Sequence, residues 1–342
     1  MKNEEMRALK YTCQLLALSL IIAACSSDAE DLKPGEGDER VPLQIVASID
    51  AQANGITRAS ETAWDAGDHI GVYVTETGNE TPFTGVNDTP ANNLKFTFDD
   101  GTNYETYGNT YRLFTSSTSK IFLSSEAVDV YGYYPYVETT IDGGDVKPDP
   151  KKMNIDVSNQ TSQKTIDFMR ARKGNVNNGN AAIELLFMHR LVKLVFNLKQ
   201  GEGLLPNELS DATYLGMVIK DQYYKATYDI YARDNESPFT IDVSTGKMDI
   251  IPVKAAAAPT GYVQTFEAIV LPNYTGTYAV TNNPAVNRTV EITFYRRADD
   301  QIVNSFVIPA ATLFRAGYKY TFNVTVNALT VTVDTEKYTE QW

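Results

Sequence analysis

Residues 318–326 read Tyr-Lys-Tyr-Thr-Phe-Asn-Val-Thr-Val and carry the alternation that decides the fold. In an extended chain the aromatic and aliphatic side chains share one face, and the Lys, Thr and Asn side chains share the other. This period of two predicts a half-buried antiparallel strand. After a short break at Asn327-Ala328, the alternation resumes in residues 329–333, Leu-Thr-Val-Thr-Val.

The same period recurs along most of the chain, with turn residues between the runs. Further strands are expected at 41–49, 69–75, 94–98, 128–134, 191–198, 214–219, 226–232, 263–271, 288–296 and 302–308. Residues 181–190 fit a short helix and a strand equally well. Because no stretch combines helical periodicity with caps at both ends, we expect an all-β protein of sandwich-type domains.

Length and charge restrict the organisation and the partners. A chain of 342 residues exceeds the size at which one hydrophobic core stops growing, so two domains are expected. The polar, Gly- and Asn-rich stretch 172–182 is expected to approach their boundary, which gives domains at 41–182 and 183–342. The formal charge of −13 opposes binding to phosphate backbones, so no nucleic-acid partner is expected.

The N-terminal residues carry an export signal. Basic residues in 1–14 precede the apolar run 15–24, which is shorter than the roughly 20 residues that span a bilayer. Such a run is typical of a signal peptide, here residues 1–24. Ile22-Ala23-Ala24-Cys25 resembles the lipobox of bacterial lipoproteins, in which the cysteine is acylated and becomes the first mature residue. The alternative is an ordinary secretory signal that ends beside a cysteine.

Residues 25–40 are acidic, rich in Gly and poor in apolar side chains, and we interpret them as a linker. Its first residues resemble the surface-export signal of Bacteroidetes lipoproteins, although a solvated tether explains them equally. Signal cleavage would also remove Cys13, the other cysteine of the chain. Disulfides and multi-cysteine zinc sites are therefore not expected, and no metal or cofactor is predicted.

Catalytic motifs are scarce. The sequence has no His-Glu-x-x-His, Gly-x-Ser-x-Gly or Walker-type motif. His69 beside Asp68 is the one conceivable base and orienting group, but neighbours on a strand point to opposite faces. Trp64 and Trp342 are far apart in the sequence and do not indicate a sugar-stacking platform. We therefore expect no enzymatic activity, and a surface hydrolase would rest on His69 alone.

A series of short motifs runs in order from the N-terminal third to the end of the sequence. These motifs are Ile56-Thr-Arg-Ala-Ser60, Trp64, Gly67-Asp-His-Ile-Gly-Val-Tyr73, Val128-Asp-Val-Tyr-Gly-Tyr-Tyr-Pro-Tyr136, Asp167-Phe-Met-Arg-Ala171, Phe187-Met-His-Arg-Leu-Val-Lys-Leu-Val-Phe196, Ala268-Ile-Val-Leu-Pro272, Ala316-Gly-Tyr-Lys-Tyr320 and Trp342. In this order they resemble the fimbrillin family of Bacteroidales-type bacteria, which comprises subunits of type V pili and related surface proteins.

The resemblance implies two tandem transthyretin-like (Greek-key) β-sandwich domains and a structural, adhesive role in a surface fimbria. It implies a lipoprotein precursor at the outer membrane, anchored there through the lipid on Cys25. An Arg-specific protease at the surface then cuts the precursor after an arginine and releases its first strand. A strand from another fimbrial subunit fills the groove that is left.

The residues that fit this scheme can be named. The displaced first strand would present Leu43, Ile45, Ala47 and Ile49 on one face. The cut would fall between Arg58 and Ala59, in a polar stretch of the kind that proteases reach. The donor-strand candidates are Leu329, Val331 and Val333, which are equally interpretable as the last strand of their own domain.

Other roles remain open at this point. The chain fits an anchor subunit that keeps its lipid and its first strand, and its place as stalk, tip or anchor is undecided. A different class of function is a monomeric surface lipoprotein that binds a glycan or another host ligand. The long polar loops expected at 76–93 and 138–165 would carry that binding.

Overall fold

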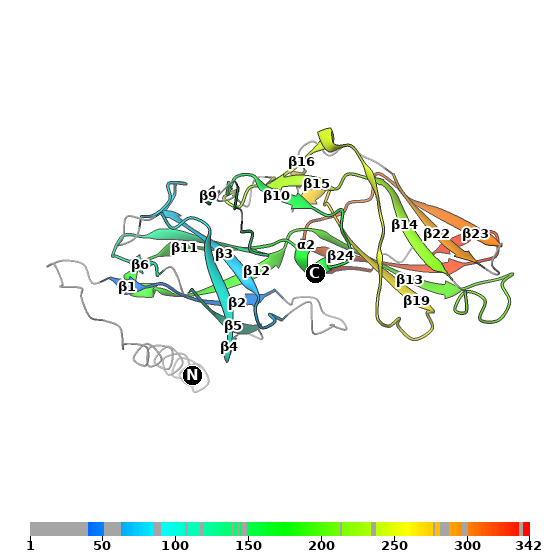
Figure 1. Cartoon of the computed structure of the whole chain (residues 1–342), viewed down its shortest axis with the longest axis horizontal. Coiled ribbons are helices and arrows are strands. Elements are labelled where there is room, and N and C mark those ends of the chain that lie inside the picture. Colours follow the sequence, from blue (N-terminus) through cyan, green and yellow to red (C-terminus); the bar gives the residue numbers. More distant parts are fainter. Residues whose placement is uncertain are drawn as a thin grey trace, which may run out of the picture. The chain divides into compact units, whose positions relative to one another are not determined.

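The computed structural model describes residues 40–50, 63–84, 90–106, 109–116, 120–138, 140–141, 144–145, 149–212, 214–233, 237–275, 278–280, 287–295, 300–334 and 338–342 (Figure 1). Within these ranges the helical elements are one short α-helix and two 3-10 turns. They are α2 (Gln163–Ile166), η2 (Asn178–Asn180) and η3 (Val243–Thr245). The remaining regular structure is strand, which confirms the all-β prediction. Among the residues described, no helix is long and apolar enough to cross a bilayer.

The first group of strands closes into a barrel in the order β11-β12-β2-β5-β4-β3-β7. Its strands are β2 (Gln44–Ile49), β3 (His69–Glu76), β4 (Leu94–Thr106), β5 (Asn109–Thr115), β7 (Val128–Tyr134), β11 (Met169–Val176) and β12 (Ala182–His189). The inward alternation of apolar side chains predicted from the sequence fills this barrel. At its centre, Trp64 packs edge-on against Phe114, Tyr134 and Phe187, with ring centroids 5.0–5.3 Å apart.

Two further sheets share a second core. One has the order β18-β19-β13-β24-β25, with β26 also paired to β24, and the other has the order β17-β14-β22-β23. The strands are β13 (Val192–Gln200), β14 (Leu215–Gln222), β17 (Met248–Ile250), β18 (Val253–Lys254), β19 (Gln264–Val270), β22 (Arg288–Tyr295), β23 (Gln301–Ile308), β24 (Tyr318–Val326), β25 (Val331–Val333) and β26 (Tyr338–Gln341). Side chains from both sheets form one hydrophobic cluster, which is the arrangement of a β-sandwich.

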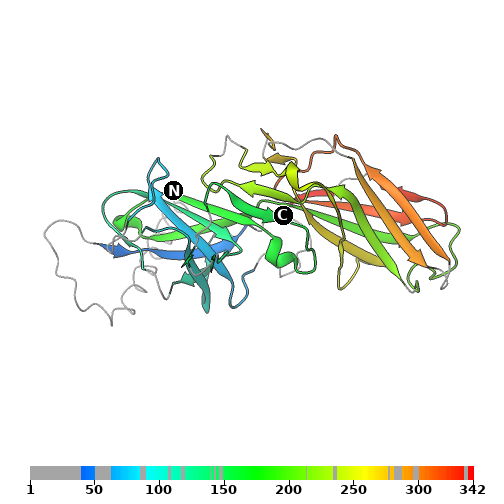
Figure 2. The ribbon, with the colours of Figure 1, turned by 45° about the horizontal axis from the view of Figure 1, so that its top comes forward.

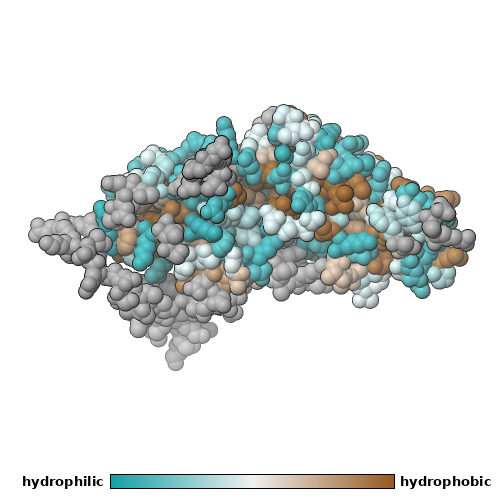
Figure 3. Space-filling model, in the orientation of Figure 1, coloured by the Kyte–Doolittle hydropathy of each residue, from teal (hydrophilic) through white to brown (hydrophobic). Residues whose placement is uncertain are grey.

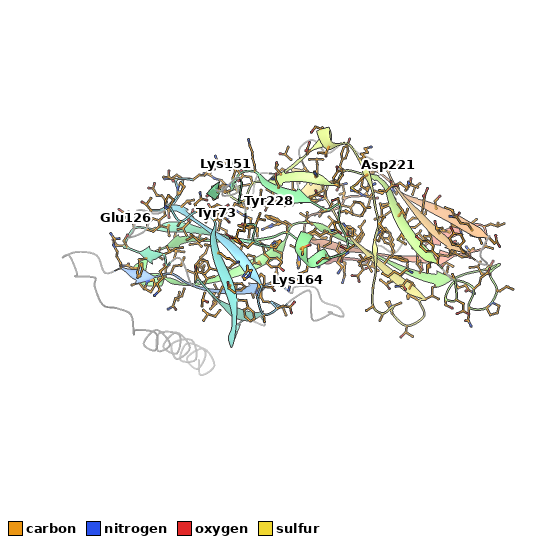
Figure 4. The ribbon with its side chains drawn as sticks, viewed as in Figure 1. Tyr73, Glu126, Lys151, Lys164, Asp221 and Tyr228 are labelled. Atoms are coloured by element: carbon orange, nitrogen blue, oxygen red, sulfur yellow. The ribbon has the colours of Figure 1, made fainter. Side chains whose placement is uncertain are left out.

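A third core is rich in tyrosine. It joins side chains from β3 and β7 of the barrel to those of a small sheet with the order β10-β15-β16, made of β10 (Met153–Asp156), β15 (Lys225–Tyr228) and β16 (Phe239–Ile241). Tyr73 of β3 and Tyr228 of β15 are both buried in it (Figure 4). The outer surface in the view of Figure 3 is mainly hydrophilic, with smaller hydrophobic areas between.

Short strand pairs complete the described structure. They are β1 (Val41–Pro42) with β6 (Phe122–Leu123), β8 (Thr140–Ile141) with β9 (Gly144–Asp145), and β20 (Tyr274–Thr275) with β21 (Tyr278–Ala279). The pair β8–β9, the strand β10 and the start of α2 all fall within the stretch 138–165 that was expected to be a long loop.

Every strand expected from the sequence overlaps an observed strand, and the ambiguous stretch 181–190 contains β12. The polar stretch 172–182 holds the end of β11 and the turn η2. The expected division at 182/183 therefore falls at the first residue of β12, whose apolar side chains lie in the barrel core. The chain passes from the last barrel strand, β12, to the first strand of the second sheet system, β13 (Figures 1 and 2), through Arg190-Leu191.

Candidate assembly site

The first barrel strand, β2, lies between two other strands. It pairs in parallel with β12 over six positions, from Gln44 opposite Ala182 to Ile49 opposite Phe187. On its other side it pairs antiparallel with β5 over three positions, centred on Val46 opposite Leu113. We call the space that β2 occupies between β12 and β5 the β2 slot.

Additional backbone bonds fix both ends of this strand. The Leu43 amide donates to the Ile121 carbonyl at 2.8 Å, and the Asp50 amide donates to the Phe187 carbonyl at 2.8 Å. In the middle, the Trp64 indole N–H donates to the Ala47 carbonyl at 3.2 Å. A strand that left the slot would therefore give up hydrogen bonds on both edges and one to the central tryptophan.

The four side chains expected on the inner face of the first strand all lie in the barrel core. Ile45 and Ala47 are fully buried, and Leu43 and Ile49 are 7% and 6% exposed. Burial of each Leu or Ile side chain stabilises the fold by about 1.5–3 kcal/mol. Removal of β2 would leave an apolar trough between β12 and β5, lined by two unpaired strand edges.

The segment that follows β2 joins two buried positions. Asp50, at the end of the strand, is 8% exposed, and Trp64, where the core resumes, is 5% exposed. The predicted cut between Arg58 and Ala59 lies between Asp50 and Trp64, outside the residues that the structure describes. The predicted lipid site, Cys25, also lies outside the described residues. A cut at Arg58 would leave β2 attached to the core by noncovalent contacts alone.

The donor-strand candidates lie on the edge of β24. Val333 and Val331 pair with Val324 and Val326, so the segment forms a hairpin with the strand before it. Leu329 in the turn is 90% exposed, and both valines are only half-buried. Farther along, β26 pairs with the other half of β24, from Tyr338 opposite Thr321 to Gln341 opposite Tyr318. The structure thus places the candidates on their own sheet.

A pocket of about 220 Å³ brings together residues that no sequence motif connects. Its lining includes Trp64, Lys164, His189, Lys193 and Trp342. Neither spacing nor a motif could have predicted this, because the topology alone joins the two tryptophans. The indole N–H of Trp342 at this pocket has no hydrogen-bond partner among the described residues.

The charged groups around the pocket are paired with one another. Lys164 on α2 (Figure 4) contacts Asp65 at 2.6 Å and Asp68 at 2.8 Å. Partial burial lowers the pKa of Lys164, but its hydrogen bonds to both carboxylates outweigh that effect and raise the pKa overall. On the other side, Lys193 lies 3.3 Å from Glu267. Paired charges of this kind hold chain segments together.

The conceivable catalytic pair is not brought together. The His69 ring nitrogen Nδ1 lies 3.0 Å from the Thr97 hydroxyl. The pKa of His69 is lowered, mainly by burial and to a smaller extent by the positive charge of Lys95. Asp68 instead accepts from the Asp65 amide at 2.7 Å and from the Tyr134 hydroxyl at 3.3 Å. Among the residues described, no cluster of three or more His, Cys, Asp or Glu side chains could hold a metal ion.

The chain matches a known protein family over most of its length. The fimbrillin-like family model matches residues 57–342. The chain belongs to the fimbrillin-like family. Membership confirms the resemblance drawn from the ordered motifs, and the family is one of fimbrial surface proteins.

Named relatives agree with this assignment. A candidate fimbrium subunit of Bacteroides uniformis, Fim1C, is 30% identical over 332 residues, which is 96% of this chain and 93% of that protein. The crystal structure of a candidate cell adhesion protein from Bacteroides uniformis shares the fold, with a TM-score of 0.56, 24% identity and coverage of 91% and 100%. A candidate cell adhesion protein from Bacteroides ovatus has a TM-score of 0.57 at 19% identity, with coverage of 89% and 98%.

Proposed function

We propose that this chain is a structural and adhesive subunit of a cell-surface fimbria, exported as a lipoprotein and assembled by protease-triggered strand exchange. The observation that carries the proposal is the position of β2. It is an internal strand of the barrel, and the chain that follows it contains Arg58. Family membership and the names of the relatives support the fimbrial role.

Export and anchoring rest on the N-terminal residues. Signal cleavage before Cys25 and acylation of its thiol hold the precursor at the outer membrane, while residues 26–40 provide a hydrophilic tether. In a precursor that keeps this lipid and β2, the β2 slot is filled and accepts no strand from another subunit. Such an uncut form corresponds to an anchor subunit.

Cleavage after Arg58 converts the precursor into an acceptor. Residues 25–58, which include β2, then leave the body without breaking any further covalent bond. The exposed edges of β12 and β5 require new backbone partners, and the trough requires apolar side chains at alternate positions. A strand from a neighbouring subunit satisfies both needs.

The register of the incoming strand is set by the slot. A strand that enters in the direction of β2 is parallel to β12 and antiparallel to β5. A shift by one residue would turn its apolar side chains away from the core, so the pattern defines the partner. Leu329, Val331 and Val333 offer such alternation within this chain, but this segment would first have to leave β24.

This role needs no catalytic group, and we infer that the chain has no enzymatic activity of its own. The partners are other fimbrial subunits, the outer membrane through the lipid, and an Arg-specific protease. The proposed function depends on strand pairing between subunits and requires no reaction centre.

The proposal is tested by the N-terminus of the surface form and by its assembly state. In cells that produce the wild-type chain together with the other fimbrial subunits, we expect surface material that begins at Ala59 and forms heat-resistant oligomers with those subunits. Arg58→Ala should abolish both, whereas Arg40→Ala should leave them unchanged, because a cut at Arg40 would precede β2. Wild-type protein that always begins at Cys25 and remains monomeric would exclude the polymerising subunit and leave the anchor role.

A further inference from the structure

Trp342 is buried in the body of the protein although the segment before it is only an edge strand. Its side chain is 7% exposed. The indole lies parallel to the His189 ring, with centroids 4.2 Å apart and planes 7° apart. The Trp342 amide donates to the Gly317 carbonyl at 2.7 Å. Both the ring and the backbone of this residue are therefore fixed.

The groups that hold Trp342 are themselves held from several elements. His189, at the end of β12, contacts Asp167 at 2.9 Å, and its side chain is almost fully buried. The Lys193 ammonium on β13 lies 5.7 Å from the centroid of the indole, where a cation is attracted to the ring. We call His189, Lys193 and Gly317 the Trp342 seat.

Gly317 is required in this seat for two reasons. Its φ of +78° is in the left-handed region that favours glycine. A Cβ atom there would also lie 2.8 Å from the His189 carbonyl oxygen. The Gly317 amide donates to the Leu191 carbonyl at 2.8 Å, so the seat ties the start of β24 to the junction of β12 and β13.

At the other end of the segment before Trp342, β25 buries its side chains only in part. β25 pairs with β24 over three positions, and its valines are half-buried. Leu329, at 90% exposure, contributes almost no burial. The segment that could serve as a donor is therefore fixed mainly where β26 and Trp342 meet the body.

We propose that Trp342 in its seat retains β25 and β26 on β24, so that the wild-type chain does not give either strand to a neighbour. The consequence for assembly rests on the proposed function. Contact with a neighbour then runs through the β2 slot, and the partner it fits is a subunit that supplies an extended strand with alternating apolar side chains. Donation from residues 329–333 requires withdrawal of Trp342.

Amide hydrogen exchange on the full chain tests retention directly. In the wild type, we expect the amides of β25 and β26 to be protected. Trp342→Ala should speed their exchange by at least about tenfold, because the anchored end of the segment is released. Leu329→Ala is the matched control on the same segment and should leave exchange unchanged, since that side chain is exposed. Trp342→Phe keeps a ring for the His189 stack and should retain most of the protection.

Exchange in β7 of the barrel shows whether a variant has simply unfolded. If Trp342→Ala speeds exchange in β25 and β26 while β7 stays protected, retention by Trp342 is supported. If exchange in β25 and β26 is the same in the wild type and in Trp342→Ala, the proposal is overturned. This readout does not depend on any fimbrial role.

A second assay tests donation. Chains cut after Arg58 and freed of the released segment are incubated, and oligomers are followed by size-exclusion chromatography. Cut wild-type chains should stay monomeric, whereas cut Trp342→Ala chains should form oligomers. Equal oligomer formation by both chains through residues 329–333 would overturn the proposal. A cut chain that fails to bind a peptide of residues 41–50 would instead refute the β2 slot, and the exchange experiment would still decide retention.

Discussion

At the residue scale, Gly71 shows how a missing side chain positions an aromatic one. It lies opposite Tyr133 of the neighbouring strand, and a Cβ atom at Gly71 would come within 1.9 Å of the Tyr133 ring. That ring is fully buried, and its hydroxyl donates to Asn93 at 2.6 Å, so it cannot move aside. The Gly71–Tyr133 pair therefore ties the barrel to the tyrosine-rich core.

Gly71→Ala should lower the free energy of unfolding by about 1–3 kcal/mol, the usual effect of overpacking a core. In a Tyr133→Ala background the same substitution should have a much smaller effect. Urea denaturation of the four chains measures this coupling. Gly67→Ala is the contrast: its φ is +88° with nothing within 4 Å of the added atom, so its effect should not depend on Tyr133. Strictly additive effects of Gly71→Ala and Tyr133→Ala would contradict the steric explanation.

Several residue-scale features could not be predicted from the sequence. Gly71 and Tyr133 both lie within the motifs that indicated the family, but a motif does not say which residues face each other. Trp64 and Trp342 line one pocket because chain topology brings them together, and no local pattern reports that. The expectation that Asp68 and His69 point apart as neighbours on one strand does not apply, because Asp68 precedes β3, and the two side chains have separate hydrogen-bond partners.

At the element scale, strand positions were predictable because apolar alternation is a local signal. The alternation of Leu43, Ile45, Ala47 and Ile49 matches their burial, and the hairpin of β24 with β25 follows the break at Asn327-Ala328. β12 was ambiguous because its apolar residues also fit a helix. Its parallel pairing with β2, from a distant part of the chain, determines the extended conformation. A local sequence pattern does not reveal such long-range pairing.

The burial of β2 gives a matched pair of substitutions. Ile45→Ala should lower the free energy of unfolding by about 2–5 kcal/mol, because it leaves a cavity in the barrel core. Val46→Ala, on the opposite face of the same strand and only half-buried, should lower it by clearly less. Denaturant titration of the uncut chains provides the comparison. Equal losses would show that β2 does not present the face assigned to it.

At the scale of the whole molecule, buried tyrosines link the separate cores and make stability depend on pH. Burial is the largest cause that raises the phenol pKa of Tyr73, Tyr133, Tyr134 and Tyr231 above the ordinary value. The folded state thus favours the neutral phenol. Its contribution to stability is complete below the unfolded pKa of about 10 and is lost as the pH rises above it.

We therefore expect the unfolding free energy to fall steeply above about pH 10, with tyrosinate formation delayed until the chain unfolds. Ultraviolet absorbance of tyrosinate and circular dichroism, followed together through an alkaline titration, measure the two events. They should coincide for the buried group of tyrosines. Full ionisation near the ordinary value in a chain that stays folded would contradict the assigned burial.

The central claim is that β2 occupies a slot that another strand can fill, and its direct test is peptide exchange. The full chain is cut after Arg58 and incubated with a labelled peptide of residues 41–50, and binding is followed by fluorescence anisotropy. The cut chain should take up the peptide in place of its released segment, while the uncut chain should not. A peptide with Ile45→Asp should fail to enter. A cut chain that binds neither peptide, or both equally, would contradict the account.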